Sequence, residues 1–195
     1  LSSELERPEI YMGDFTIERS LRPDLVVSAS YLYSKGKKLP IFIDTNLGTA
    51  NSEVTYLLGA ENLGTFPFYR GARPDANIGR SIEVRSVAES QYHALVLQAQ
   101  KRWSGGFLFN ANYTLSKATD NGQNSTTFIS GFMNVFDPAN LALEDGTSNL
   151  DRRHRVVTSL HYAPPWLWGF QFGAIGTFES GLPVTGTLSG GVVSA

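Results

Sequence analysis

The chain has 195 residues, of which 42% are hydrophobic and 17% charged, with a net charge of −2 and no cysteine. The charged fraction is below the roughly 25% usual for soluble domains. The absence of cysteine excludes disulfides, thiolate metal sites and a cysteine nucleophile. The near-neutral charge provides no basic field to attract nucleic acid, and no apolar run approaches the roughly 18 residues of a transmembrane helix.

Apolar and polar residues alternate with a period of two in six separate runs, whereas helical periodicity is nearly absent. This alternation predicts half-buried β-strands. The clearest run places Phe109 and Ala111 on one face and Asn110 and Asn112 on the other. The phase changes within the third run, and a bulge near residues 88–91 would account for the change. We expect strands at about residues 10–21, 25–34, 78–103, 107–117, 153–163 and 170–180.

The predicted connections alternate between short turns and two long loops, at about residues 35–77 and 118–151. Transmembrane barrels combine short periplasmic turns with long outer loops in this way. Trp103 and Trp166 lie beside predicted turns, whereas Tyr31 and Tyr113 lie toward the loops, as expected for two aromatic belts at the bilayer interfaces. The sequence therefore predicts an all-β fold, an antiparallel up-and-down transmembrane β-barrel segment.

Six strands are too few to close a single-chain bacterial barrel, which needs at least about eight. Lipid-facing backbone must also be fully paired. The chain lacks an initiator Met and a terminal strand that would close a barrel, so we expect residues 1–195 to be part of a larger one. An alternative that fits the same alternation is a soluble β-sandwich that binds carbohydrate, with its apolar faces buried in a shared core.

Six short motifs carry a resemblance to a known family. They lie, in this order, at residues 90–95, 101–106, 111–117, 136–141, 151–155 and 178–184. Together they resemble the barrel of TonB-dependent receptors of the Oar-like type, in which a carboxypeptidase-regulatory-like domain typically precedes the plug. An earlier strand pair within residues 14–36 fits the same barrel, and the likeness spans about residues 8–187.

The resemblance implies a barrel of about 22 strands around a plug, in the outer membrane of a Gram-negative bacterium. It implies uptake of a scarce ligand, a siderophore, an oligosaccharide or a peptide, with energy delivered through the TonB complex. Outer-membrane lipid would surround the wall. No plug and no TonB box can be identified within these 195 residues. A barrel with a structural or adhesive role and no transport remains the alternative.

Ligand contacts are expected in the long outer loops, because loops carry recognition on a rigid frame. The first loop contains an aromatic and basic patch that could stack on a sugar or a hydrophobic ligand: Tyr56, Phe66, Phe68, Tyr69, Arg70 and Arg73. Packing of the loop on itself is the other interpretation. The sequence has no nucleophile elbow and no phosphate-binding loop, so we expect neither an enzyme nor a cofactor.

Charged residues elsewhere do not predict a metal site. The densest cluster, at residues 151–155, is interpreted as a solvated strand entry in preference to an anion contact. The acidic residues of the second loop lack the spacing of a calcium loop: Asp120, Asp137, Glu144, Asp145 and Asp151. No two of His93, His154 and His161 have the spacing of zinc ligands on one element.

Overall fold

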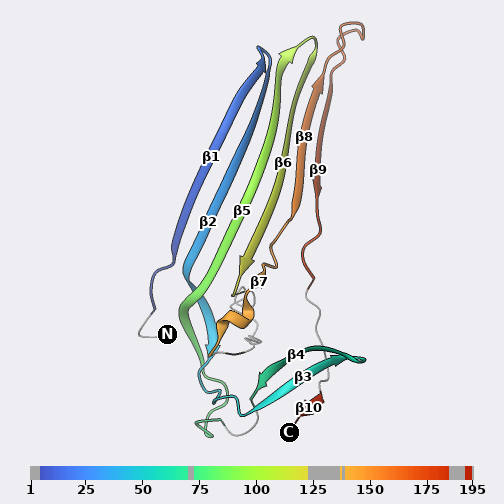
Figure 1. Ribbon diagram of the computed structural model, residues 1–195. Coiled ribbons are helices and arrows are strands. Elements are labelled where there is room, and N and C mark those ends of the chain that lie inside the picture. Colours follow the sequence, from blue (N-terminus) through green and yellow to red (C-terminus); the bar gives the residue numbers. More distant parts are fainter. Residues whose placement is uncertain (1–4, 70–72, 123–136, 138, 185–191, 195) are drawn as a thin grey trace.

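The computed structural model describes residues 5–69, 73–122, 137, 139–184 and 192–194. Six long strands form one sheet in the order β1-β2-β5-β6-β8-β9, and every neighbouring pair is antiparallel. Figure 1 shows them as a tall, twisted wall with the short turns at one end. The bounds are β1 Glu9–Arg22, β2 Leu25–Asp44, β5 Ile82–Ser104, β6 Phe107–Asp120, β8 His154–Tyr162 and β9 Phe172–Glu179.

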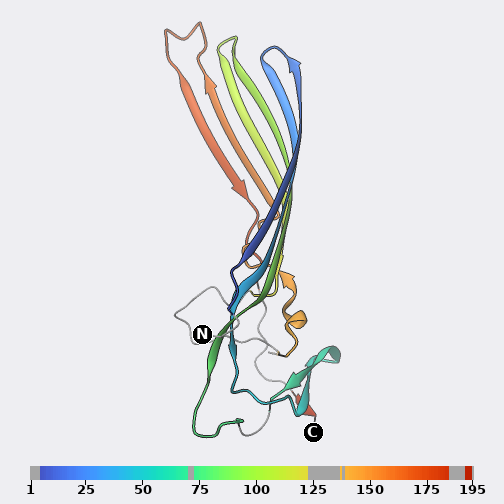
Figure 2. The same cartoon turned by 90° about the vertical axis from the view of Figure 1, so that its left-hand side faces the viewer.

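The remaining elements lie at the opposite end from the short turns (Figures 1 and 2). The hairpin of β3 (Ser52–Leu58) and β4 (Glu61–Phe68) pairs with β10 (Val192–Ser194) in a separate three-stranded sheet. A short 3-10 helix, η2 (Leu141–Glu144), leads into β7 (Gly146–Thr147), which pairs with the end of β6. In the described part of the chain, no helical segment has the length and apolar character that crossing a bilayer requires.

The tight turn between β5 and β6 explains why positions 105 and 106 are both glycine. Gly105 and Gly106 have φ angles of 60° and 78°, and a two-residue hairpin turn of type I′ requires positive φ at both central positions. A Cβ on Gly106 would also lie 2.5 Å from the carbonyl oxygen of Ala163 on the neighbouring connection. Only glycine therefore fits at position 106 without movement of the backbone.

The register sorts the side chains of the six strands into two faces. Residues directly opposite each other in an antiparallel pair share a face, so the pairings can be followed from β1 to β9. One row runs through Glu18, Ser28, Gln98, Asn112, Val157 and Thr177. The adjacent row, on the other face, runs through Ile17, Ala29, Leu97, Tyr113, Val156 and Phe178. The sheet thus has one predominantly polar face and one predominantly apolar face.

The first long loop departs from the prediction. Strand β2 continues to Asp44, and the β3–β4 hairpin occupies much of the rest of the segment predicted as loop. The sequence signal was weak because the hairpin carries Gly59 and Gly64, both with positive φ, and Pro67 within β4. In the second loop, the segment 123–136 and residue 138 lie outside the described residues; β6 continues to Asp120, and η2 and β7 precede β8.

The phase change predicted near residues 88–91 is observed slightly earlier. Between the pairs Gly36↔Ser90 and Pro40↔Ser86 the register shifts twice, once in each strand. Lys38, at the shift in β2, has a φ of 55°. Beyond these bulges β2 and β5 remain paired, and Ile41, Ile43 and Ala88 are buried there, with Leu39 and Leu141 packed against them. This small cluster supports the base of the loop region.

Candidate functional site

The apolar face carries two tyrosine–histidine pairs near the loop end of the wall. The hydroxyl of Tyr31 on β2 lies 2.6 Å from Nδ1 of His93 on β5. The hydroxyl of Tyr113 on β6 lies 2.9 Å from Nδ1 of His154 on β8, with the two rings stacked. Tyr31 is directly opposite Leu95, and Tyr113 is directly opposite Val156. In each pair the histidine is two residues from that opposite residue, on the side nearer the long loops. The two pairs form part of a belt of amphipathic rings.

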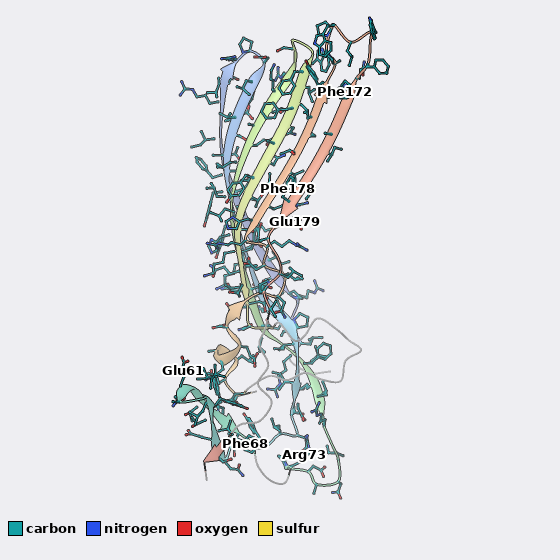
Figure 3. All side chains as sticks on the ribbon, turned by 90° about the vertical axis from the view of Figure 1, so that its right-hand side faces the viewer. Glu61, Phe68, Arg73, Phe172, Phe178 and Glu179 are labelled. Carbon is teal, nitrogen blue, oxygen red and sulfur yellow. The ribbon has the colours of Figure 1, made fainter. Side chains whose placement is uncertain are left out.

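A second aromatic belt surrounds the turn end. On the apolar face, Phe107 stacks on Phe109 and meets Tyr162 edge-on. On the polar face, where the register places His161, Trp103 meets His161 edge-on. Trp166 and Trp168, in the β8–β9 connection, are exposed. Figure 3 shows Phe172 at the turn end of β9 and Phe178 nearer the end of β9 that faces the loops. The apolar face is therefore bordered by aromatic residues at both ends.

An ion pair joins two neighbouring short turns. Nζ of Lys101 lies 2.6 Å from the carboxylate of Asp24, and the Ser104 hydroxyl donates to the same oxygen at 2.5 Å. The Lys101 and Ser104 hydrogen bonds lower the pKa of Asp24 from 3.8 to about 2. The backbone N–H of Arg102 donates to the Asp24 carbonyl at 2.7 Å. The β1–β2 turn is thereby held against the end of β5.

The structure divides the described residues of the predicted loop patch between the β3–β4 hairpin and the neighbouring loop. Tyr56 and Phe66 pack together on the β3–β4 hairpin, with ring centroids 5.8 Å apart. Figure 3 shows Phe68 on β4 and Arg73 on a separate stretch of loop. Tyr69 donates its hydroxyl to Asp137 of the second long loop. Arg70 lies outside the described residues.

Arg73 belongs to a hydrogen-bonded anchor at the loop end of β2. Its guanidinium lies 2.8 Å from the carboxylate of Asp44 and 3.1 Å from the carbonyl of Asn46. The buried Asn46 amide donates to the carbonyls of Asp75, Ile78 and Gly79. Burial acts to raise the pKa of Asp44, but Arg73 and two backbone N–H groups outweigh it and hold that pKa below its ordinary value. No local pattern in the sequence predicts this anchor, because its members are about 30 residues apart.

A cavity of about 640 Å³ lies beside this anchor and between the two long loops. Its lining combines apolar residues with charged and aromatic ones: Ile43, Asp44, Leu47, Tyr69, Arg85 and Asp137. Burial and the Asp137 carboxylate raise the pKa of Tyr69 to about 12, so this hydroxyl stays protonated and donates at neutral pH. Among the predicted patch residues that the structure describes, Tyr69 lines the cavity, and Arg73 supports it through Asp44.

A family model described as an outer membrane beta barrel domain matches residues 1–194. The chain belongs to this family. Its location is accordingly the outer membrane, and the soluble sandwich considered from the sequence is wrong. No curated protein and no solved structure matches the chain.

Membership in this outer-membrane family shows how the sheet is oriented in the membrane, with respect to both its two ends and its two faces. In such barrels short turns face the periplasm and long loops face outward, while apolar side chains face lipid and polar ones face the lumen. The short β1–β2 and β5–β6 turns, beside the Asp24–Lys101 ion pair, are therefore periplasmic. The cavity beside Tyr69 is on the outer side of the membrane. The two aromatic belts border the apolar band at the two bilayer interfaces.

The charged cluster at residues 151–155 is bonded within the protein. Arg152 and Arg155 both pair with Glu179 of β9, at 2.6 and 2.9 Å. Arg153 donates to the carbonyl of Ser116 at 3.1 Å, and the buried carboxylate of Asp151 accepts from the N–H of Ala118 at 2.7 Å. These bonds fix the entry of β8, which favours the interpretation as a strand entry over an anion contact.

The acidic residues of the second loop are dispersed. Asp137 accepts hydrogen bonds from Tyr69 and from the N–H of Ala139, whereas Asp145 lies beside β7. Within the described residues, no group of three or more histidine, aspartate or glutamate side chains is arranged to hold a metal ion. His93 and His154 instead bond tyrosines, and His161 lies 3.2 Å from the amide oxygen of Gln171.

Proposed function

We propose that the chain is part of the wall of a TonB-dependent receptor that binds a scarce ligand outside the cell and imports it with energy delivered through TonB. The observation that carries this proposal is the cavity of about 640 Å³ between the two long outer loops. The ordered set of motifs that resemble Oar-like receptors supports it independently. On this proposal the barrel has about 22 strands and encloses a plug.

The construction of the cavity suits a recognition site. Ligand sites combine apolar walls with a few placed polar groups, and here Ile43 and Leu47 are joined by Asp44, Arg85 and Asp137. The Tyr69–Asp137 hydrogen bond joins the two loops that form the cavity. The Arg73–Asp44 ion pair fixes the first of these loops to the end of β2. A siderophore, an oligosaccharide and a peptide each offer such a mixture of apolar and polar surface.

The test uses the full-length protein that contains this chain. The purified protein is assayed for binding to the periplasmic domain of TonB, and cells lacking its gene are grown on three scarce nutrient sources: a ferric siderophore, a maltooligosaccharide and an oligopeptide. We expect TonB binding and a growth defect on one source that inactivation of TonB reproduces. Absence of TonB binding together with unchanged growth would favour the structural or adhesive barrel instead.

Loop variants then test the cavity itself. Arg73→Ala removes the ion pair to Asp44 and Tyr69→Phe removes the bond to Asp137; each is expected to weaken binding of the nutrient so identified by about tenfold, or roughly 1.4 kcal/mol. Glu61→Gln, at the exposed tip of the β3–β4 hairpin, is the matched control and should bind normally. Equal affinity in all three variants would place the ligand elsewhere.

A further inference from the structure

The outer end of β6 is followed by an asparagine and a glycine. β6 ends at Asp120, and Asn121 and Gly122 come next, both half-buried. They form the only Asn-Gly dipeptide among the 195 residues. The backbone nitrogen that follows an asparagine can attack the side-chain amide carbon and close a cyclic imide. Glycine favours this attack because it has no Cβ to obstruct the approach of its backbone.

The structure places a base at the attacking nitrogen. The backbone N–H of Gly122 donates to a carboxylate oxygen of Asp120 at 3.2 Å. A general base must lie within hydrogen-bond reach, about 2.6–3.2 Å, of the group from which it takes a proton. The amide nitrogen becomes nucleophilic when it loses its proton, so the Asp120 carboxylate is placed to activate it.

A backbone donor lies at the group that would be attacked. Oδ1 of Asn121 accepts a hydrogen bond from the backbone N–H of Glu89 on β5 at 2.7 Å. The Asn121 N–H in turn donates to the Glu89 carbonyl at 3.2 Å. Attack on Cγ converts Oδ1 into an oxyanion, and fixed N–H donors at about 2.7–3.1 Å stabilise such a charge. The pairing with β5 therefore holds and polarises the Asn121 amide.

We propose that Asn121 is a site of spontaneous deamidation, for which the fold supplies the base and the oxyanion donor. The Asp120 carboxylate takes the Gly122 amide proton as a bond forms between that nitrogen and Cγ of Asn121. The Cγ–Nδ2 bond then breaks, and ammonia leaves with the proton that Asp120 held. Water adds to either carbonyl of the imide, restores the Gly122 N–H and leaves aspartate or isoaspartate.

The two products have different effects on the end of the β5–β6 ladder. Aspartate can keep both hydrogen bonds to Glu89, whereas isoaspartate directs the backbone through Cβ and Cγ and so lengthens it at the start of the second long loop. Either product adds a negative charge beside Asp120 and Glu89. The modification changes the outer end of the wall irreversibly, and the proposal is independent of transport and of TonB.

The test follows the full-length protein, purified from outer membranes, by peptide mapping during prolonged incubation at neutral pH. Electron-transfer fragmentation distinguishes isoaspartate from aspartate at position 121. We expect both products to accumulate, and Asp120→Asn to slow their formation about tenfold, because an amide accepts the same hydrogen bond without acting as a base. Asp145→Asn, which changes another carboxylate of the pocket that Asp120 lines, is the matched control and should react at the parent rate.

A short peptide with the same sequence around Asn121 separates the effect of the fold from that of the sequence, because Asp120→Asn should change its rate little. The heat-dependent shift of SDS-gel mobility checks that each protein variant is folded. Equal rates in the parent and the folded Asp120→Asn protein would overturn the proposal, as would an equal slowing in the peptide. Formation of aspartate without isoaspartate would also overturn it, since direct hydrolysis needs no imide. Intact Asn121 in a protein whose peptide deamidates would show that the ladder protects the amide.

Discussion

The hydroxyl of Tyr113 lies 2.9 Å from Nδ1 of His154 on the neighbouring strand, with the two rings inclined by 17°. The Tyr31–His93 pair repeats this relationship one hairpin earlier, at 2.6 Å. A ring with a polar tip is suited to the boundary between hydrocarbon and water, and bonding between strands adds to the sheet ladder. The pairs therefore mark the outer interface and stabilise the wall there.

Removal of one such hydroxyl should destabilise the barrel modestly. Tyr113→Phe and Tyr31→Phe are each expected to lower the free energy of unfolding by about 0.5–1 kcal/mol, as for other polar pairs in membranes. Urea unfolding in lipid vesicles measures the change. Tyr33→Phe is the control, since Tyr33 meets His93 through its ring; an equal loss in that variant would show that the hydrogen bonds contribute nothing.

The Asp24 carboxylate in the periplasmic turn should make the free energy of unfolding depend on pH in the acidic range. The pKa of Asp24 is lowered from 3.8 to about 2 in the folded state, so its contribution is complete above pH 3.8 and is lost as the pH falls toward 2. Asp24→Asn should therefore be less stable than the parent protein at pH 6, and the difference should vanish near pH 2. Urea midpoints at several pH values test this. A difference that stays constant with pH would assign the effect to turn geometry.

Gly106 should be the more sensitive of the two turn glycines. Gly105→Ala adds a Cβ in open space at positive φ, whereas Gly106→Ala adds both positive φ and a contact at 2.5 Å from the Ala163 carbonyl. Positive φ alone costs about 1–2 kcal/mol, so the loss at Gly106 should exceed that value. Gly105→Asn should be milder than Gly105→Ala, because asparagine tolerates this conformation. Unfolding in detergent compares the variants, and equal losses at both positions would contradict the predicted contact.

The six strands could be predicted from the sequence because the signal is local. Each transmembrane run alternates with period two, and the predicted faces of β6 agree with the register, with Tyr113 on one side and Asn112 on the other. The loop architecture could not be predicted, because its bonds join distant residues: Tyr69 and Asp137 are 68 positions apart. The β3–β4 hairpin could not be predicted either, because Gly59, Gly64 and Pro67 are residues that indicate loops and disfavour the interior of a strand.

A charge placed on the two faces should have opposite consequences. Arginine on a lipid-facing residue at the bilayer midplane costs about 2–4 kcal/mol, whereas lumen-facing positions tolerate it. Ala111→Arg should therefore reduce assembly in the outer membrane sharply, and Asn112→Arg, the adjacent residue on the polar face, should assemble normally. Quantification of the folded protein in outer-membrane fractions distinguishes them, and a reversed order would mean that the faces are exchanged.

The most direct test of the central claim, that β6 crosses the bilayer as part of a barrel wall, is a spin-label scan of residues 109–114. The chain contains no cysteine, so single cysteines introduced in the full-length protein label cleanly if the rest of that protein is also cysteine-free. Reconstituted in lipid, labels at Phe109, Ala111 and Tyr113 should collide with oxygen, and labels at Asn110, Asn112 and Thr114 with a water-soluble nickel complex. Accessibility without this alternation, or with nickel reaching both sets equally, would contradict the account.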